Sequence, residues 1–284
     1  MKTRHITAAA SLALACSAAA ASGFECLLEP WQVVEVRSAV DGVIAAITVN
    51  RGDAVRRGQP LVVLQSAAEK AGVDSAHFRA RMDGQIAAAR NRIDYATKKL
   101  ARLTELQKDN YSSAQARDEA DAEKRLAESE LQSALEAREL ARIEARRADE
   151  LLALRTLAAP FNGVVVDRML NPGDLAESGA GRKPVLKVAQ IDPIRADVPL
   201  PAPLFGQVRP GTRARVTSAV GGGSFDAVVR HVDRVIDAAS GTFVARLEVP
   251  NPHGVVPGGA RCSATIDGLA TPARPPVRPR NAND

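Results

Sequence analysis

The cysteines are the side chains whose positions permit chemistry most directly. Cys26 and Cys262 lie near opposite ends of the chain, and Cys16 lies in an apolar run close to the N-terminus. If Cys16 is removed with that run, an oxidising compartment allows the other two to form a disulfide. Closing so long a loop would restrict the unfolded chain by about 4 to 5 kcal/mol in the entropy model. Cys26 and Cys262 are therefore a candidate disulfide; the alternative is two unlinked, small apolar side chains.

Other side chains with catalytic potential are scattered along the chain. His77, His231 and His253 have no serine, cysteine or paired carboxylates at a recognisable spacing, although acid–base or nucleophilic catalysis requires such partners. Beyond the N-terminal run the methionines are Met82 and Met169, too few and too far apart for a methionine metal cluster. We therefore expect no enzymatic activity, no cofactor and no metal site.

The chain begins with an export signal, predicted over residues 1–21. Basic residues precede a short apolar run that passes into small residues up to Ala21, which is the order of a cleaved secretory signal. The apolar run is shorter than a membrane-spanning helix requires. The residues before Cys16 also imperfectly match a lipoprotein processing site, so lipidation of Cys16 is the alternative to cleavage near Ala21. No later segment is expected to cross a membrane.

The composition favours long helices over a thick globular core. Aromatic residues make up only 3% of the chain, and the net charge of +5 is spread along it. Such a distribution lacks the clustered basic surface that nucleic-acid binding needs. We expect an elongated α+β protein that binds no nucleic acid.

Two copies of a short β pattern lie on either side of a long helix-forming stretch. Asp-Gly or Asn-Gly opens each copy, which favours a tight turn with positive φ, and Gly-Asp marks a second turn at an equal interval. Residues 31–66 and 157–190 are therefore predicted to be the two halves of one β-sandwich; two unrelated hairpins are the alternative. The turn residues are Gly42, Gly52 and Asp53 in the first copy and Gly163, Gly173 and Asp174 in the second.

Residues 67–156, between the two halves, are predicted to form an antiparallel helical hairpin. The first helix is expected to run unbroken from about Ala67 to Gln107, because this stretch contains no proline and its apolar residues recur at alternating steps of four and three. This heptad seam comprises Met82, Ile86, Ala89, Ile93, Ala96, Leu100 and Leu103.

The second helix is predicted from about Ser113 to Leu154. Ser112 and Gln115 have the spacing of a capping box at its start. Its apolar stripe matches that of the first helix, and Arg138 alone interrupts it. The stripe comprises Ala127, Leu131, Ala134, Ala141, Ala145, Ala148 and Leu152.

Residues 191–267 are predicted to form a small antiparallel β-barrel. Alternating apolar and polar residues, separated by Gly-rich or Pro-Gly turns, indicate short strands. Residues 268–284 are rich in proline and arginine, which predicts a disordered tail. Strands are expected at 213–217, 225–236, 243–249 and 261–266, with a short helical piece around 204–208.

This order of parts resembles the periplasmic adaptor, or membrane fusion protein, family (HlyD-like) of tripartite efflux pumps of the resistance-nodulation-division type. The resemblance covers about residues 31–267; the sandwich looks like a lipoyl or biotinyl carrier domain, and residues 232–236 and 257–259 resemble the family's barrel pattern. It implies a non-enzymatic periplasmic protein, associated with the inner membrane, that links an inner-membrane transporter to an outer-membrane channel for export of small molecules. It also implies a ring of several copies. An adaptor of an ATP-driven export system is the alternative.

The resemblance also implies a docking site at the hairpin tip. Family members that dock onto outer-membrane channels carry an arginine, a leucine four residues later and a serine or threonine eleven after the arginine, which here are Arg102, Leu106 and Ser113. Arg102 would reach carboxylates or carbonyls of the channel, Leu106 would fill a groove between the proteins, and Ser113 would cap a helix and hydrogen-bond across. The alternative is a solvated Arg102, a packed Leu106 and a purely capping Ser113.

Two departures from related patterns limit what is carried over. Larger family members have a membrane-proximal domain built from both termini, for which this sequence leaves few residues, so we transfer no transporter-contact residue. A biotinyl or lipoyl carrier would present a lysine at the turn between its halves, but Ala68 occupies that position and Lys70 falls two residues late. A carrier protein is therefore the weakest alternative.

Overall fold

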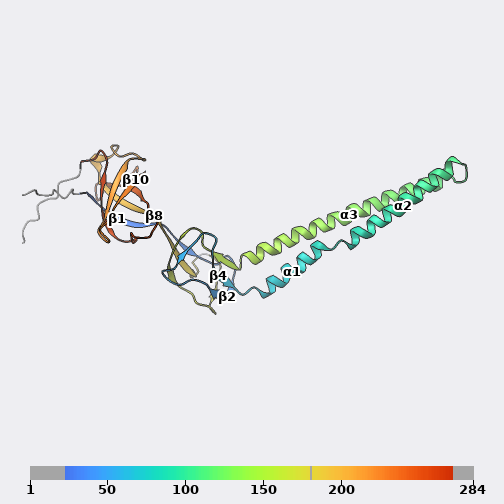
Figure 1. Ribbon diagram of the computed structural model, residues 1–284, viewed down its shortest axis with the longest axis horizontal. Coiled ribbons are helices and arrows are strands. Elements are labelled where there is room, and N and C mark those ends of the chain that lie inside the picture. The colour runs from blue at the N-terminus through green and yellow to red at the C-terminus, as the bar shows by residue number, and fades with distance from the viewer. Residues whose placement is uncertain (1–22, 180, 271–284) are drawn as a thin grey trace, which may run out of the picture. The chain divides into compact units, whose positions relative to one another are not determined.

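The computed structural model describes residues 23–179 and 181–270, which fall into two compact units (Figure 1). One unit is Val33–Ala189, and the other combines residues up to Gln32 with those from Gln190 onward. The expected signal at 1–21, Cys16 and most of the tail at 268–284 lie outside the described residues. The α+β class is confirmed, with a split β-sandwich, a helical hairpin and a β-barrel.

The sandwich is built by an exchange of short strands between its two halves. One sheet has the order β5-β4-β2-β7, and the facing strands run in the order β3-β6-β8. Strand β3 of the first half pairs with β6 of the second, and β7 of the second half pairs with β2 of the first. The strands are β2 (Gly42–Ile47), β3 (Ala54–Val55), β4 (Pro60–Leu64), β5 (Thr156–Ala158), β6 (Gly163–Arg168), β7 (Leu175–Ala176) and β8 (Leu186–Pro201).

The Gly-Asp turn of the first half attaches to a strand of the second. Gly52 has φ +92°, a conformation that favours glycine. Its N–H donates to the carbonyl of Val165 at 2.8 Å, and the Val165 N–H donates to the carbonyl of Asp53 at 2.9 Å. The Asp53 carboxylate also accepts the Asn50 N–H at 2.7 Å, which closes the turn.

The second half repeats these contacts in reverse. Gly173 has φ +94°, and its N–H donates to the carbonyl of Ile44 at 2.9 Å, while the Ile44 N–H donates to the carbonyl of Asp174 at 2.9 Å. The Asp174 carboxylate accepts the Asn171 N–H at 2.8 Å. Ile44 and Val165, the two strand residues held this way, are both buried, so the exchange lies against the sandwich core.

Gly42 and Gly163 do not form the positive-φ turns that the sequence predicted. Neither has positive φ, and each begins a strand. A Cβ on Gly163 would lie 2.2 Å from the carbonyl oxygen of Ala189, and a Cβ on Gly42 would lie 2.7 Å from Nη1 of Arg155. The prediction of a positive-φ turn was wrong at both positions. At Gly163 the need for glycine comes from a tertiary backbone contact, whereas at Gly42 the crowding atom is the movable end of the Arg155 side chain.

The hairpin contains three helices, because the ascending arm is interrupted. They are α1 (Ala67–Arg81), α2 (Gly84–Lys108) and α3 (Ala114–Ala153). Met82 has an extended backbone with ψ 125°, and Asp83 takes the N-cap position of α2. Aspartate followed by glycine favours a new helix start over a continuing helix. The expectation of an unbroken first helix was therefore wrong, and Met82 is 59% exposed and outside the seam.

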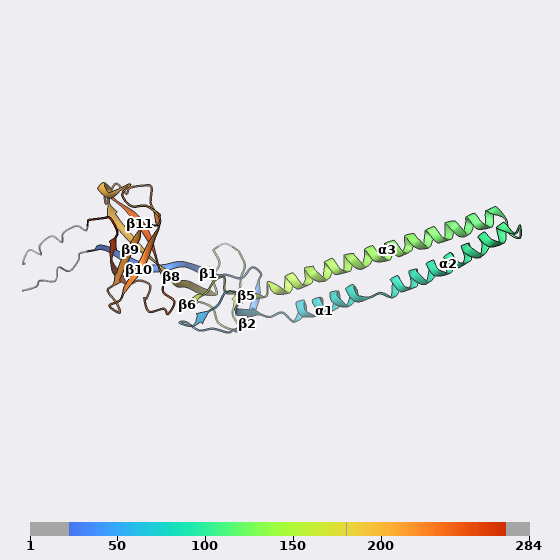
Figure 2. The ribbon, with the colours of Figure 1, turned by 45° about the horizontal axis from the view of Figure 1, so that its top comes forward.

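The helices pack through small side chains. Helix α3 lies along both α1 and α2 (Figure 2), and the residues buried between α2 and α3 are mostly alanines. Ion pairs flank this seam: Arg92 Nη1 lies 2.5 Å from Glu130 Oε2, and Lys99 Nζ lies 2.6 Å from Glu123 Oε2. The exposed charges at the flanks add little stability, so the seam is held mainly by close apolar packing.

Arg155 attaches the base of the hairpin to the sandwich. Its guanidinium lies 2.6 Å from Glu69 Oε1 on α1 and donates to the carbonyl of Asp41 at 2.9 Å. The Asp41 carboxylate accepts the N–H and the hydroxyl of Ser178; these hydrogen bonds, with a smaller contribution from the nearby Arg182, lower the pKa of Asp41. Both arms of the hairpin and both halves of the sandwich thus meet at one polar cluster.

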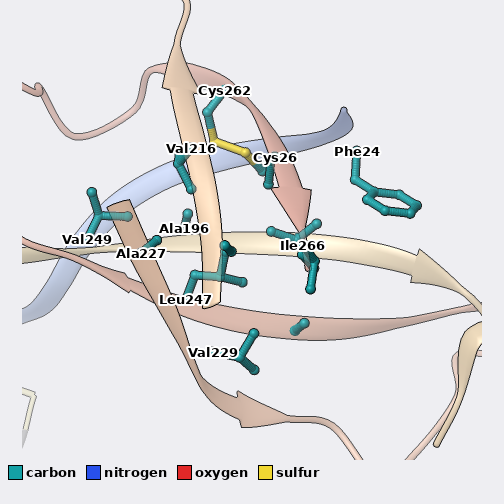
Figure 3. Close-up of a cluster of buried hydrophobic side chains, with 14 of the residues drawn as sticks. Phe24, Cys26, Ala196, Val216, Ala227, Val229, Leu247, Val249, Cys262 and Ile266 are labelled. Atoms are coloured by element: carbon teal, nitrogen blue, oxygen red, sulfur yellow. A yellow bond between two sulfur atoms is a disulfide. The ribbon is translucent and has the colours of Figure 1, made fainter. Parts of the chain in front are cut away.

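Six strands close into the β-barrel. Their order is β1-β12-β9-β10-β11-β8, and pairing of β1 with β8 completes the ring. Apolar side chains from opposite strands meet in its core (Figure 3). The sequence did not predict that residues before position 31 contribute a strand. The strands not yet described are β1 (Phe24–Val36), β9 (Arg213–Ser218), β10 (Ser224–Val232), β11 (Thr242–Val249) and β12 (Arg261–Ile266).

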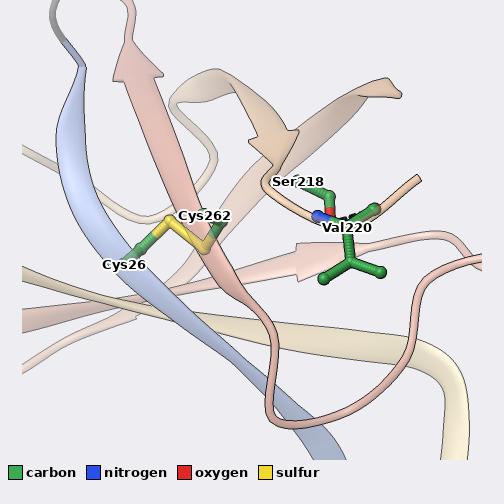
Figure 4. The surroundings of a disulfide bond; sticks show 4 residues. All are labelled: Cys26, Ser218, Val220 and Cys262. Carbon is green, nitrogen blue, oxygen red and sulfur yellow. Dashed lines mark hydrogen bonds between the residues drawn. A yellow bond between two sulfur atoms is a disulfide. The ribbon is translucent and has the colours of Figure 1, made fainter. Parts of the chain in front are cut away.

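A disulfide joins Cys26 of β1 to Cys262 of β12 (Figure 4). The two residues are direct partners in the antiparallel register, and their Cα atoms are 4.8 Å apart. On the other side of Cys262, the buried Ser218 of β9 is its register partner. The Ser218 hydroxyl bonds the backbone of Val220 at the turn that follows. The disulfide therefore links strands from the two ends of the described chain.

Two smaller predictions about the barrel need correction. The helical piece expected around 204–208 is a single 3₁₀ turn, η1 (Ala202–Leu204), which ends before Gly206, a residue with φ +85°. The strand expected at 225–236 ends at Val232, and Val235 is 79% exposed in the following loop. Beyond Val232 the pairing with β11 continues only at single residues, where the N–H groups of Asp233 and Asp237 donate to the carbonyls of Val244 and Thr242.

Replacing Gly163 with alanine should lower the free energy of unfolding by about 1–3 kcal/mol, because the new Cβ would push against the Ala189 carbonyl in a packed sheet. Urea denaturation followed by circular dichroism measures this. Gly84→Ala is the matched control: its Cβ meets nothing within 4 Å, so stability should stay the same or rise by up to about 1 kcal/mol. Equal stability of the two variants would contradict the close-packing role of Gly163.

Candidate docking site at the tip of the hairpin

The tip begins with a Schellman motif that ends α2. Asn110 has φ 63° and is the only residue other than glycine with a positive φ in the described chain. The Tyr111 N–H donates to the Leu106 carbonyl at 2.8 Å, and the Asn110 N–H donates to the Gln107 carbonyl at 3.1 Å. This pair of hydrogen bonds, with a left-handed residue between them, defines the motif. The chain therefore turns at a fixed point after Lys108.

Tyr111 is the residue of the tip that the sequence reasoning did not select as a site. In a Schellman motif the residue in its position commonly contacts the one in the position of Leu106. Tyr111 is 82% exposed and Leu106 is 37% exposed, so the tip presents an aromatic and an aliphatic side chain to solvent. The available signal was the asparagine that precedes Tyr111, because asparagine tolerates the left-handed conformation that ends a helix.

Ser113 caps the N-terminus of α3. Its Oγ accepts the N–H of Ala116 at 3.1 Å, as expected for an N-cap residue. The predicted capping box of Ser112 and Gln115 is wrong, because the helix begins one residue later and the Gln115 side chain donates to Glu119 at 3.0 Å. Ser113 thus performs the capping role on which both interpretations of the tip agree.

Arg102 lies one helical turn before Leu106 on α2, so the two side chains share one side of the helix. Arg102 is exposed and forms no ion pair within the described part of the chain. Lys99, one turn further back, hydrogen-bonds Glu123 of α3, and this contact raises the pKa of Lys99. The pair joins the two arms just below the tip, whereas Arg102 and the exposed Lys108 have no ion-pair partner among the described residues.

The chemistry of this tip is that of recognition. It combines a guanidinium, which pairs with carboxylates or carbonyls, with exposed Leu106 and Tyr111 and a hydroxyl already used in capping. Among the described residues no group of three or more His, Cys, Asp or Glu side chains is arranged to hold a metal ion. In the same part of the chain, no helix combines the length and apolar character needed to cross a membrane.

Residues 32–189 match the profile of the CzcB-like, barrel-sandwich hybrid domain. The chain is 25% identical over 212 residues to the cobalt-zinc-cadmium resistance protein CzcB of Cupriavidus metallidurans, with 75% of this chain and 38% of CzcB covered. It is 26% identical over 242 residues to the multidrug efflux pump subunit AcrA of Escherichia coli K12, with 80% of this chain and 57% of AcrA covered. The chain therefore spans less than two thirds of either relative.

The crystal structure of MacA from Actinobacillus actinomycetemcomitans has a similar fold. Its TM-score is 0.71 at 22% sequence identity, with 86% of this chain and 77% of that chain covered. At this identity the likeness shows the fold alone. It extends beyond the matched sandwich and hairpin, whose profile ends at residue 189.

Replacing Ser113 with alanine should destabilise the first turn of α3 by about 0.5–2 kcal/mol, because the N–H of Ala116 loses its acceptor. Amide hydrogen exchange at Ala116, measured by NMR, should become faster by the factor that corresponds to this loss of free energy. Ser112→Ala is the control, since the Ser112 side chain makes no hydrogen bond within the described residues. Similar exchange in both variants would show that the cap contributes nothing to the tip.

Proposed function

We propose that this chain is a non-enzymatic periplasmic adaptor. It belongs to the CzcB-like barrel-sandwich hybrid family of efflux-pump membrane fusion proteins. It links an inner-membrane transporter to an outer-membrane channel for the export of small molecules. The observation that carries this proposal is the tip, where Leu106 and Tyr111 are exposed at a fixed turn between two long helices.

The way the hairpin is anchored supports a role in reaching a partner. The chain leaves the sandwich after β4 and returns to it at β5, and these two strands pair with each other. Arg155 holds the same point through Glu69. A hairpin fixed at its base and capped at its tip presents a defined end to another protein. In this proposal Arg102, Leu106 and Ser113 contact the channel, and Tyr111 extends that contact.

The proposed cargo is a small molecule. One relative is named as a cobalt-zinc-cadmium resistance protein and another as a multidrug pump subunit, so the names of the relatives span different cargo classes. We assign the choice of cargo to the transporter. Several copies of the chain form a ring around the export path in this proposal, with the sandwich and barrel facing the transporter.

Arg102→Asp should reduce capture of the channel by at least about tenfold, because a carboxylate would meet carboxylates or carbonyls in place of a guanidinium. Periplasmic crosslinking followed by peptide identification measures capture in cells. Wild-type protein should recover a transporter and a channel, and the variant should recover the transporter alone. Arg90→Asp, an exposed charge reversal on α2 away from the tip, should recover both.

Recovery of neither partner by the wild-type protein would sink the proposed function. Unchanged capture by the Arg102→Asp variant would remove only the assignment of Arg102. The two results are separable because the transporter serves as an internal reference in each sample.

Tyr111→Ala should weaken channel capture by about tenfold or more, because exposed aromatic side chains at an interface commonly carry a large share of the binding energy. Tyr95→Ala is the control: Tyr95 is 61% exposed on the same hairpin but away from the tip. Crosslinked channel is compared between the variants after normalisation to the transporter. If both tyrosine variants capture the channel as well as wild type does, Tyr111 is not part of the docking site.

A further inference from the structure

The hairpin seam contains one charged residue, Arg138, at a position where the pattern calls for an apolar side chain. It faces a groove of about 580 Å³ that Arg138 and Asp83 both line, so the groove reaches the interruption between α1 and α2. The break in the helix at Met82 and Asp83 and the charged residue in the seam therefore border the same groove. Its charged lining consists of Arg81, Arg138, Arg142 and Arg146 with Asp83 and Glu139, and His77 lies beside them.

The four guanidinium groups of this arginine groove are poorly neutralised. Glu139 is shared: its Oε2 lies 3.4 Å from Nη1 of Arg142 and its Oε1 lies 3.9 Å from Nη2 of Arg146. Arg138 and Arg81 form no ion pair with any described residue; Arg81 only donates to the His77 carbonyl. Most of the donors of these groups are left without an anionic partner.

The carboxylate of Asp149, three residues after Arg146, is already engaged. Both oxygens of Asp149 lie 2.9 Å from Nε2 of His77, so this side chain faces the histidine. Asp83 lines the groove but forms no ion pair with any of its arginines in the described chain. The arginines therefore outnumber the carboxylates that could neutralise them.

The spacing of the arginines on α3 is unfavourable for the helix alone. Arg138, Arg142 and Arg146 follow each other at intervals of four residues and so lie on one side of the helix, where like charges repel. Elsewhere on the same helix a cation pairs with a carboxylate four residues away, as Arg125 does with Asp121 at 2.6 Å. Arg146, by contrast, forms no ion pair with Glu150, four residues after it. The arrangement in the groove favours an external anion that compensates the repulsion.

We propose that the arginine groove binds a multiply charged oxyanion of the phosphate type. Guanidinium groups present planar pairs of N–H donors that match the oxygens of phosphate, and several of them around one hollow favour a ligand with more than one negative charge. A diphosphate and the phosphate headgroup of an anionic lipid share this chemistry. The inference does not depend on the proposed adaptor function, because it rests only on contacts within the hairpin.

Isothermal titration calorimetry of the purified protein with inorganic pyrophosphate tests the site, at constant ionic strength. Wild-type protein should bind, and Arg138→Leu should weaken binding by about tenfold or more through loss of charge-assisted hydrogen bonds. Leucine continues the apolar seam, so this variant should fold. Arg142→Gln should show a similar loss, and because Arg142 is 54% exposed it tests the site without altering the seam.

Arg125→Leu is the matched control, since it removes one arginine of α3 outside the groove, and its binding should equal that of wild type. Co-sedimentation with phosphatidylglycerol or phosphatidylcholine vesicles distinguishes the source of the phosphate. If the wild-type protein sediments with phosphatidylglycerol vesicles but not with phosphatidylcholine vesicles, and Arg138→Leu sediments with neither, the ligand is a lipid headgroup. If the protein binds pyrophosphate but sediments with neither kind of vesicle, the ligand is soluble.

Two results would overturn the site. One is the absence of binding to both pyrophosphate and phosphatidylglycerol vesicles. The other is equal binding by wild type, Arg142→Gln and Arg138→Leu, which would place the anion elsewhere. Neither result affects channel capture by the tip, so failure here is distinguishable from failure of the adaptor proposal.

Discussion

The exchange of Gly-Asp turns between the two halves of the sandwich is the constraint on which the hairpin depends. Gly52 bonds a strand of the second half, and Gly173 bonds a strand of the first, so neither half completes its hydrogen bonding alone. Because unpaired backbone groups in a packed core are costly, the halves must meet. The chain between them must then leave and re-enter at neighbouring strands, which two antiparallel helical arms accomplish.

The sequence was most informative where a local pattern and a tertiary contact require the same residue. Gly52 and Gly173 were predicted as turns and adopt the positive φ that such turns need. Gly42 and Gly163 were selected by a similar pattern but have no positive φ. At Gly163 crowding by the distant Ala189 backbone explains the glycine, and such crowding has no local sequence signal. The strand that begins at Phe24 was missed for a related reason, since its partner β12 lies at the other end of the described chain.

At the candidate docking site, too, a feature set by neighbouring residues could be predicted from the sequence, and features set by tertiary structure could not. The cap at Ser113 could be predicted to within one residue, because capping depends on a few neighbouring groups. The exposure of Tyr111 could not, because it depends on where α2 ends, and helix ends are set by the balance of capping and packing. Arg138 was visible in the sequence as an exception to the seam, but its meaning required the interruption of the facing arm at Met82. Such exceptions mark places where function and folding make different demands.

The origin of the barrel strands has a consequence for the order of events as the chain is made. Strand β1 begins at Phe24, before the sandwich and the hairpin, whereas β12 is the last strand of the described chain. All of residues 33–189 is therefore synthesised before β1 can meet its antiparallel neighbour, and since domains generally fold as units from the N-terminus, the sandwich and hairpin can mature first. During this interval the edge of β1 that pairs with β12 has no partner strand, and Cys26 cannot form its disulfide until Cys262 has been synthesised.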